Sequence, residues 1–341
     1  MRSFTRTSLL VSLSFAVVGT APLRADPAAE IVSFSIFKTV DLAKLAKGDP
    51  MVAHGPAMKF ARGLEVESVF VLPMPVQRAN ELQMHWDGAR HSELKIFQHV
   101  DLPRKPALAD FQQIASAPAN SSVKAFVTAT EKLNPERPEL QMSAAEAKQF
   151  TKSDGASKGA MSANVSAFWS NLLHKRATAF LSGGLPGQPA ILAGGKAIRA
   201  VDEANELLRE RPGIRKQFSA LADTMLGGKA NPELNYELFD VEGRAALSLG
   251  ASYSKAVGEG WQGGTVQFYS SDGFNVMLTF TQLWPVQIDG KPMTLVWRGD
   301  LVAANQLGDL RGIERSGSAV AMRKEIQKNV NAMVKDLSSK R

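Results

Sequence analysis

The sequence predicts an α+β protein in which an antiparallel sheet packs on a long C-terminal helix, with a helical insertion or subdomain in the middle of the chain. Three observations predict this class. Residues 30–104 and 235–303 contain segments in which apolar and polar residues alternate, as in half-buried strands. Residues 105–230 are rich in alanine and have helical spacing. Residues 318–337 carry a single apolar stripe at the spacing of an amphipathic helix.

The first 25 residues contain the parts of a secretory signal peptide in the required order. Arg2 and Arg6 precede the apolar run LLVSLSFAVV, and small residues then lead to Ala25. The apolar run is about half of the roughly 20 residues that a transmembrane helix needs. We therefore expect export, with the signal peptide (1–25) cleaved after Ala25 and no integral membrane segment left after cleavage. A cut after Ala21 is the alternative.

The chain of 341 residues contains no cysteine. Eukaryotic secreted domains of this size usually carry disulfides, whereas many bacterial envelope proteins carry none, so we expect a bacterial periplasmic or secreted protein. Loss of Arg2, Arg6 and Arg24 with the signal peptide reduces the formal net charge from +7 to +4. The remaining Lys and Arg residues are dispersed among acids, which predicts no nucleic-acid partner.

The N-terminal part of the mature chain, 26–104, is predicted to hold strands and one short helix. Residues 30–75 contain three extended segments, and VQRANELQMHW (76–86) then has roughly helical spacing before the turn signal Asp87-Gly88. SELKIFQHVDL (92–102) alternates apolar and polar residues, as a half-buried strand does.

The middle of the chain, 105–230, is predicted to be a helical insertion whose helices are separated by polar or glycine-rich connections. One connection, GGLPGQPAILAGG (183–195), invites comparison with a phosphate-binding loop. It lacks the Gly-Lys-Ser/Thr ending and the G-x-G-x-x-G register that such loops use, so we expect no nucleotide cofactor there and no cofactor elsewhere.

The last part, 231–341, is predicted to form an antiparallel meander followed by the C-terminal helix. Its strands are separated by turn signals at 258–260, 272–273 and 289–290. We expect this part to pack with 26–104 as one domain, because the amphipathic helix needs an apolar surface and the meander is the nearest one.

This arrangement resembles the START-like, or helix-grip, superfamily. The residues that carry the resemblance are Pro75-Val76 at the start of the first helix, Trp86 at its end, and the C-terminal stretch 312–337. The resemblance implies a curved antiparallel sheet wrapped around the long C-terminal helix, with an apolar ligand or lipid in the cavity between them. The helical middle, about 120 residues long, would then be an insertion.

Two apolar surfaces would face each other across such a cavity, and we expect a hydrophobic or amphipathic, lipid-like molecule to contact both. If the sheet instead packs directly on the helix, the same residues are core and need no ligand. The candidate ligand-binding residues are Phe274, Val276, Leu278, Phe280, Leu295 and Trp297 on strands and Met322, Ile326, Val330 and Met333 on the helix.

The leading interpretation is therefore an exported binding protein without catalysis. An envelope hydrolase or a metal-dependent enzyme is the first alternative, with a site near His85, Asp87 and His91 and with His99 close by in sequence. The spacing of the three histidines matches no zinc motif, and they are predicted on a helix end, a loop and a strand, so we expect no tight metal site. A structural or protein-interaction role is the second alternative.

Overall fold

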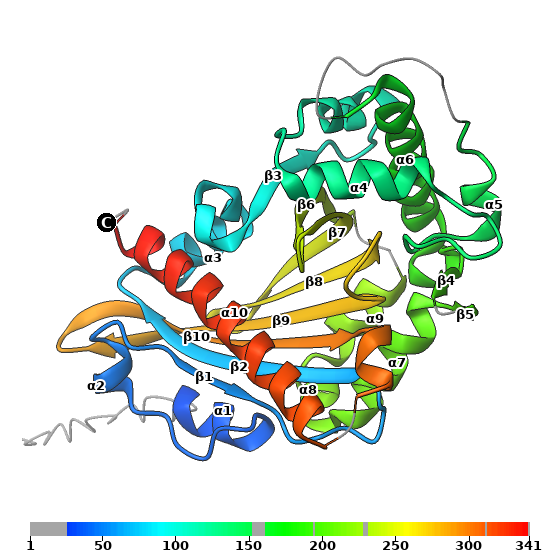
Figure 1. Cartoon of the computed structure of the whole chain (residues 1–341). Helices are drawn as coiled ribbons and strands as arrows, with labels where there is room; N and C mark the ends of the chain where they lie inside the picture. The colour runs from blue at the N-terminus through cyan, green and yellow to red at the C-terminus, as the bar shows by residue number, and fades with distance from the viewer. Residues whose placement is uncertain (1–25, 152–160, 194, 228–230, 311, 340–341) are drawn as a thin grey trace, which may run out of the picture.

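The computed structural model describes residues 26–151, 161–193, 195–227, 231–310 and 312–339 (Figure 1). The predicted signal peptide, 1–25, lies outside the described residues. Within the described part, eight strands form one antiparallel sheet, and the long helix α10 (Gly312–Ser339) packs against it. Helices occupy the middle of the chain. The predicted α+β class is therefore confirmed.

The sheet joins the two ends of the chain, in the strand order β1-β2-β10-β9-β8-β7-β6-β3. The last five strands form a meander, in which each strand pairs with the next. The strands β7–β10 are the four that the predicted turn signals separate, and β6 precedes them. The N-terminal strands flank this meander, with β2 beside β10 and β3 beside β6. The strands are β1 (Met51–His54), β2 (Gly63–Leu72), β3 (Ile96–Leu102), β6 (Glu233–Val241), β7 (Arg244–Val257), β8 (Gly260–Ser270), β9 (Val276–Ile288) and β10 (Lys291–Ala303).

A second, two-stranded sheet, β4 (Ile191–Ala193) with β5 (Lys196–Ile198), lies among the helices of the middle region. The described helices before α10 are α1 (Pro27–Phe34), α2 (Leu42–Leu45), α3 (Val76–Met84), α4 (Ser121–Glu131), α5 (Ala144–Ala147), α6 (Ala163–Gly183), α7 (Ala200–Glu210), α8 (Pro212–Gln217) and α9 (Ser219–Gly227). Short 3₁₀ turns are η1 (Gly88–Arg90), η2 (Ser92–Leu94), η3 (Leu108–Ser116), η4 (Leu185–Gly187) and η5 (Asn305–Gly308).

The turn between β9 and β10 follows from the local sequence. Asp289 and Gly290 both have positive φ, at 51° and 71°. This is the backbone of a two-residue type I′ turn, whose twist matches that of the flanking strands and which favours Asp-Gly. The turn pairs Lys291 with Ile288 and so sets the register of the whole β9–β10 ladder.

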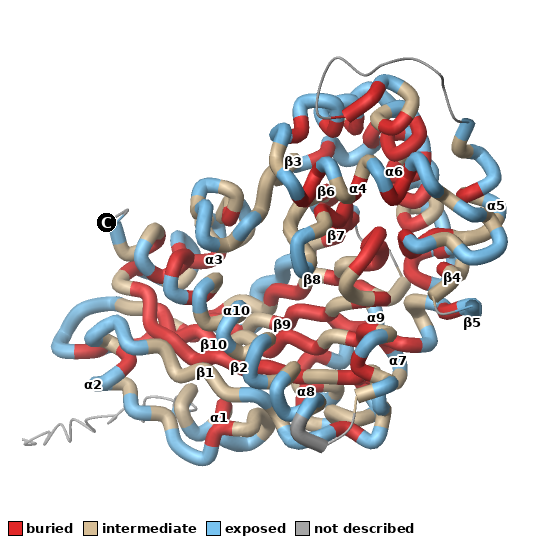
Figure 2. Tube along the Cα trace, in the orientation of Figure 1, coloured by how far each residue is buried: buried red, intermediate tan, exposed pale blue. Residues whose placement is uncertain are grey.

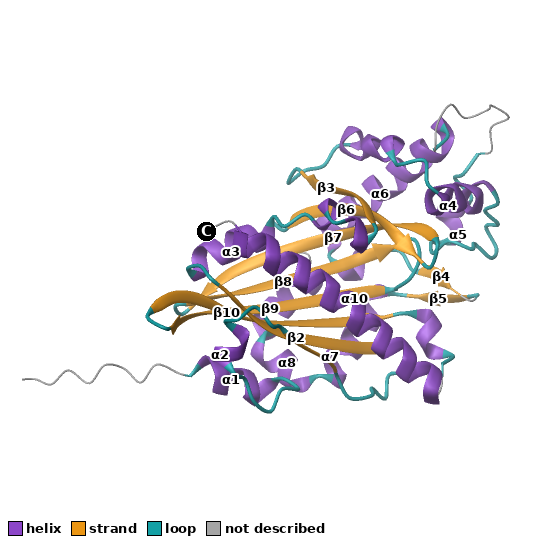
Figure 3. Ribbon diagram, turned by 60° about the vertical axis from the view of Figure 1, so that its left-hand side comes forward, coloured by secondary structure: helices purple, strands orange, loops and turns teal. Residues whose placement is uncertain are grey.

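The two faces of the sheet carry separate hydrophobic clusters, because successive side chains of a strand point to opposite faces. On β2, Val69 and Val71 belong to a large cluster that includes residues of α1 and of the middle helices. Phe70 and Leu72 belong to a smaller cluster with α3 and α10. The sheet is thus a central layer, with the middle helices on one face and α3 and α10 on the other (Figure 3). Most strand residues are buried between them (Figure 2).

Helix α10 packs mainly through its C-terminal half. Val330, Met333, Val334 and Leu337 are buried against β2, β10 and α3, at the predicted three-to-four-residue spacing. The N-terminal half of α10, to about residue 325, holds exposed and half-buried residues, among them Val320. In the described part of the chain, no helix is both long and apolar enough to cross a membrane.

Candidate ligand-binding cavity

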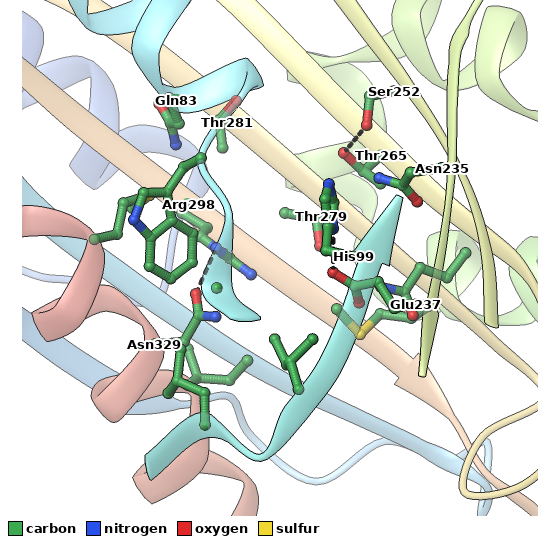
Figure 4. Close-up of a pocket in the computed structure, with 18 of the residues that line it drawn as sticks. Gln83, His99, Asn235, Glu237, Ser252, Thr265, Thr279, Thr281, Arg298 and Asn329 are labelled. Atoms are coloured by element: carbon green, nitrogen blue, oxygen red, sulfur yellow. Dashed lines mark hydrogen bonds and ion pairs between the residues drawn. The ribbon is translucent and has the colours of Figure 1, made fainter. Parts of the chain in front are cut away.

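A cavity of about 410 Å³ lies on the α10 face of the sheet (Figure 4). Its walls come from strands β3 and β6–β10, from α3 and the turns that follow it, and from α10. The cavity is therefore lined by both ends of the sequence, which meet here because β2 and β3 flank the C-terminal meander.

The floor of the cavity is a polar surface of the sheet. Met277, Thr279 and Thr281 of β9 line it, at the spacing of two residues that places side chains on one face. Thr265 of β8 lies opposite Thr279, and Ser252 of β7 lies opposite Thr265. The Ser252 and Thr265 hydroxyls are hydrogen-bonded at 3.0 Å. A row of hydroxyl groups thus crosses three neighbouring strands.

One end of the floor holds a buried ion pair. The guanidinium of Arg298 donates two hydrogen bonds to the carboxylate of Asp300, each 2.8 Å long. The Thr279 hydroxyl donates a third to Asp300 at 2.7 Å, and Asp300 is completely buried. Arg298 also donates to Asn329 of α10 at 3.3 Å, which links the floor to the helix (Figure 4). The pair neutralises its own charge and fixes the guanidinium in place.

The β3 side of the cavity holds a second ion pair. His99 Nδ1 lies 2.8 Å from Glu237 Oε1, and His99 Nε2 lies 3.2 Å from Asp101 Oδ1. Burial lowers the pKa of His99, but the hydrogen bonds and charges of Glu237 and Asp101 outweigh it and raise the pKa to about 9. His99 is therefore a cation at neutral pH that donates to two carboxylates.

The walls that face the floor are of mixed character, with apolar side chains beside Asn80, Gln83 and Glu325. Trp86, Leu94 and Ile96 surround Gly88, where an added Cβ would lie 2.8 Å from the Ile96 side chain. Ile326 and Met333 of α10 also line the cavity. At another wall, Phe239 and Phe274 stack with their ring centroids 6.2 Å apart. The cavity thus combines a polar floor with clusters of apolar side chains in its walls.

Only three of the predicted ligand-binding residues line this cavity: Phe274, Ile326 and Met333. Val276, Leu278, Phe280, Leu295 and Trp297 are fully buried on the opposite face of the sheet, in the cluster of the middle helices. There, the rings of Phe280 and Trp297 lie 5.1 and 5.5 Å from that of Phe218, which ends α8.

The helix stripe lies on the cavity side. Val330 is fully buried in the smaller cluster, and Met322 is half-buried in the N-terminal half of α10. The structure therefore does not bring the predicted strand face and helix stripe together. The reason is that two layers compete for the sheet: the middle helices cover the more apolar face, and α10 takes the other.

No protein-family model and no curated protein matches this chain.

The three histidines of 85–99 do not converge. His85 is exposed at the end of α3. His91 Nε2 lies 2.7 Å from Asp336 Oδ2 of α10, and His99 pairs with Glu237. Asp87 instead caps η1 by accepting a hydrogen bond from Ala89 N. Across the described residues, no three His, Cys, Asp or Glu side chains form a group that could hold a metal ion.

The sequence contains one signal for the polar floor. Thr279 and Thr281 alternate with Leu278 and Phe280 and so share the second face of β9, but a strand face with threonines is also typical of a solvent-exposed face. The ladder partners Thr265, Ser252 and Arg298 could not be assigned, because strand register is not visible in the sequence.

Proposed function

We propose that this chain is an exported periplasmic or secreted protein that binds an amphipathic small molecule in the cavity between the sheet and α10, without catalysing a reaction. The observation that carries the proposal is the presence of a polar floor and of apolar wall residues, among them Trp86, Ile326 and Met333, in one cavity. Its volume, about 410 Å³, falls within the roughly 300–1,000 Å³ typical of pockets that hold small organic ligands.

Membership of the START-like superfamily is part of this proposal. Its support is architectural: an antiparallel sheet packs against a long C-terminal helix, and a cavity lies between the two. In that superfamily the ligand occupies the corresponding space. The 105–230 region would then be an insertion that closes the far face of the sheet.

The polar floor favours an amphipathic ligand over a purely apolar one. Covering unpaired hydroxyl and amide groups with a hydrocarbon would remove them from water without replacing their hydrogen bonds, at about 1–3 kcal/mol for each group. Burial of an apolar portion against Trp86, Ile326 and Met333 contributes about 25 cal/mol for each Å² removed from water. An amphipathic molecule can form hydrogen bonds with the polar floor and still bury its apolar portion against the apolar wall residues.

The enzyme alternative near His85 and His91 has less support. A general base or a metal ligand must face a space that a substrate can enter, and His91 instead pairs with Asp336 while His85 is exposed on the helix end. His99 does line the cavity, yet both of its ring nitrogens are within hydrogen-bonding distance of carboxylates.

Extraction of the purified protein followed by mass spectrometry tests the proposal. We expect a co-purifying amphipathic molecule, and its addition to stripped protein should raise the melting temperature, because ligand at 100 times its Kd adds about 2.7 kcal/mol to the free energy of unfolding. The variant Thr265→Trp fills the floor and should abolish both effects.

Thr128→Trp, on the exposed surface of α4, is the matched control and should bind as the wild type does. Wild-type protein that yields no ligand and shows no thermal shift across a panel of amphipathic molecules would rule the proposal out and leave the protein-interaction role. Retention of the ligand by Thr265→Trp would place the site elsewhere.

A further inference from the structure

The charged residues that line the cavity are already paired with opposite charges. His99 pairs with Glu237, and Arg298 pairs with Asp300. The two remaining acids of the lining, Asp240 and Glu325, have Lys95 at 3.5 Å and Lys328 at 2.7 Å. Within the described lining, no ion lacks a counter-ion that a ligand would supply.

Four uncharged side chains of the lining remain open to hydrogen bonding. The side chains of Gln83, Asn235, Gln267 and Thr281 line the cavity and form no hydrogen bond with another described residue. Three of the four are amides, which both donate and accept, and the fourth is a hydroxyl, which does the same. Gln83 reaches the cavity from α3, and the other three from strands β6, β8 and β9.

Two glycines leave space beside two of these four side chains, Asn235 and Thr281. Gly250 lies opposite Asn235 in the β6–β7 ladder, and Gly263 lies opposite Thr281 in the β8–β9 ladder. A Cβ at Gly250 would collide with the Asn235 amide, and one at Gly263 would collide with the Thr281 hydroxyl. On the glycine side, neither polar group therefore has a cross-strand side chain that covers it. On the other side Asn235 lies opposite Asp101 and Thr281 lies opposite Arg298, and neither pair is hydrogen-bonded.

An ionised head group would lose its hydration in this cavity and could gain a counter-ion only by breaking an existing pair, which makes its transfer costly. A head group that both donates and accepts can instead bind the open amides and the hydroxyl without disturbing any ion pair. The cavity therefore favours uncharged head groups over ionised ones, because its neutral groups lack hydrogen-bond partners while its charged groups already have counter-ions.

Given the proposed binding function, on which this inference rests, we infer that the ligand carries an uncharged head group rich in hydroxyl or amide groups. The head group lies on the sheet floor, where it binds Gln83, Asn235, Gln267 and Thr281 (Figure 4 labels all but Gln267). The apolar portion faces Trp86, Ile326 and Met333.

A series of amphiphiles with one octyl tail and different head groups tests this inference by isothermal titration calorimetry, below the concentrations at which micelles form. Octyl glucoside supplies hydroxyls alone, and an octanoyl amide of glycinamide supplies amides alone. Octyl sulfate and octyltrimethylammonium supply an anion and a cation. At least one uncharged member should bind about tenfold more tightly than either ion, as expected for one to two additional hydrogen bonds.

The net positive charge of the protein attracts anions without specificity, so the titrations are repeated at raised salt, where that attraction is screened. The variants Gln83→Met and Gln267→Met keep the length of the side chain and remove the amide. Each should weaken binding of the uncharged head group about fivefold, the loss of one hydrogen bond, and leave the weak binding of the ions unchanged.

Gln112→Met, on the exposed surface of η3, is the matched control and should bind as the wild type does. Melting curves of all three variants confirm that they are folded, and the head-group series in the wild type needs no variant at all. Equal or tighter binding of an ionised head group at high salt overturns the inference and leaves the proposed function standing. Absence of binding by every member contradicts the proposed function itself.

Discussion

Glu65 and Glu67 place two carboxyl groups on one face of β2, within the larger core. They are 3% and 1% exposed. Arg211 donates to Glu65 at 2.5 Å, and Glu67 accepts hydrogen bonds from Trp297 Nε1 at 2.8 Å and from the backbone of Ile36 at 3.1 Å. Burial, followed by the neighbouring Glu65, raises the pKa of Glu67 to about 8. At neutral pH the folded protein therefore keeps a proton on Glu67.

This proton makes stability depend on pH in a defined direction. The unfolded chain loses the proton near the ordinary value of 4.5, and the folded protein keeps it up to about pH 8. The free energy of unfolding is therefore unaffected by this group below pH 4.5. Above that pH it declines by up to about 1.4 kcal/mol per pH unit, until Glu67 loses its proton in the folded protein as well.

The variant Glu67→Gln should remove this decline, because the glutamine amide mimics the protonated carboxyl and its carbonyl still accepts from Trp297. Denaturant unfolding at a series of pH values from 5 to 9 measures the effect. The difference between Glu67→Gln and wild type should shift in favour of the variant as the pH rises to 8 and then level off. Glu233→Gln, at an exposed position of β6, should give a constant difference. A constant difference for Glu67→Gln as well would show that Glu67 is not protonated in the folded protein at neutral pH.

Among the elements, α10 is hydrogen-bonded to the segment after α3 through the carboxylate of Asp336. Asp336 Oδ2 accepts from Trp86 Nε1 at 3.0 Å and lies 2.7 Å from His91 Nε2. This hydrogen bond to Asp336 is the main cause of the raised pKa of His91. The stabilisation that protonated His91 gives through this hydrogen bond is fully present below the ordinary pKa of 6.5. It is lost as the pH rises through the raised pKa of the folded protein, so the attachment of α10 weakens in alkali.

Asp336→Ala should release the C-terminal turns of α10 from the turns that follow α3. We expect a loss of about 1–3 kcal/mol in unfolding free energy, since two hydrogen-bond donors lose their acceptor. Hydrogen exchange should become faster in residues 330–339 and stay unchanged in the middle helices. Asp223→Ala removes a comparable carboxylate from an exposed pair with Arg215 and should cost less than about 1 kcal/mol. Equal losses of unfolding free energy in Asp336→Ala and Asp223→Ala would show that Asp336 does not hold α10 to the segment after α3.

The strands and helices also show which features of the fold can be predicted from the sequence. The meander was predictable, because its strands are neighbours in sequence and pair with their neighbours in space. The alternation on β9 correctly separated Leu278 and Phe280 from Thr279 and Thr281. The alternation does not predict which helices pack on which face of the sheet. Both the middle helices and α10 carry apolar surfaces, and their placement depends on the path of the whole chain. The candidate cavity lies beside α10 as the resemblance implied, but its polar floor depends on long-range register.

At the scale of the whole molecule, the N-terminal residues of the predicted mature chain take part in the fold. Asp26 accepts a hydrogen bond from Ala28 N at 3.0 Å and so caps α1. Glu30 accepts from Gln217 at 2.7 Å and from Trp284 at 3.0 Å, which ties α1 to the middle helices and to β9. We predict that the exported protein begins at Asp26. N-terminal sequencing of the protein from its native host would show this residue first, whereas retention of Met1 on cytoplasmic protein would disprove export.

Photo-crosslinking can show whether an amphipathic molecule occupies the cavity between the sheet and α10, as proposed above. A probe with an uncharged sugar head and a diazirine in its octyl tail is irradiated with the folded protein, and the labelled residues are mapped by mass spectrometry. The account predicts labels on Trp86, Ile326 and Met333, which excess unlabelled octyl glucoside removes and Thr265→Trp prevents. Labels confined to other surfaces, or labels at these residues that the competitor does not reduce, would contradict it.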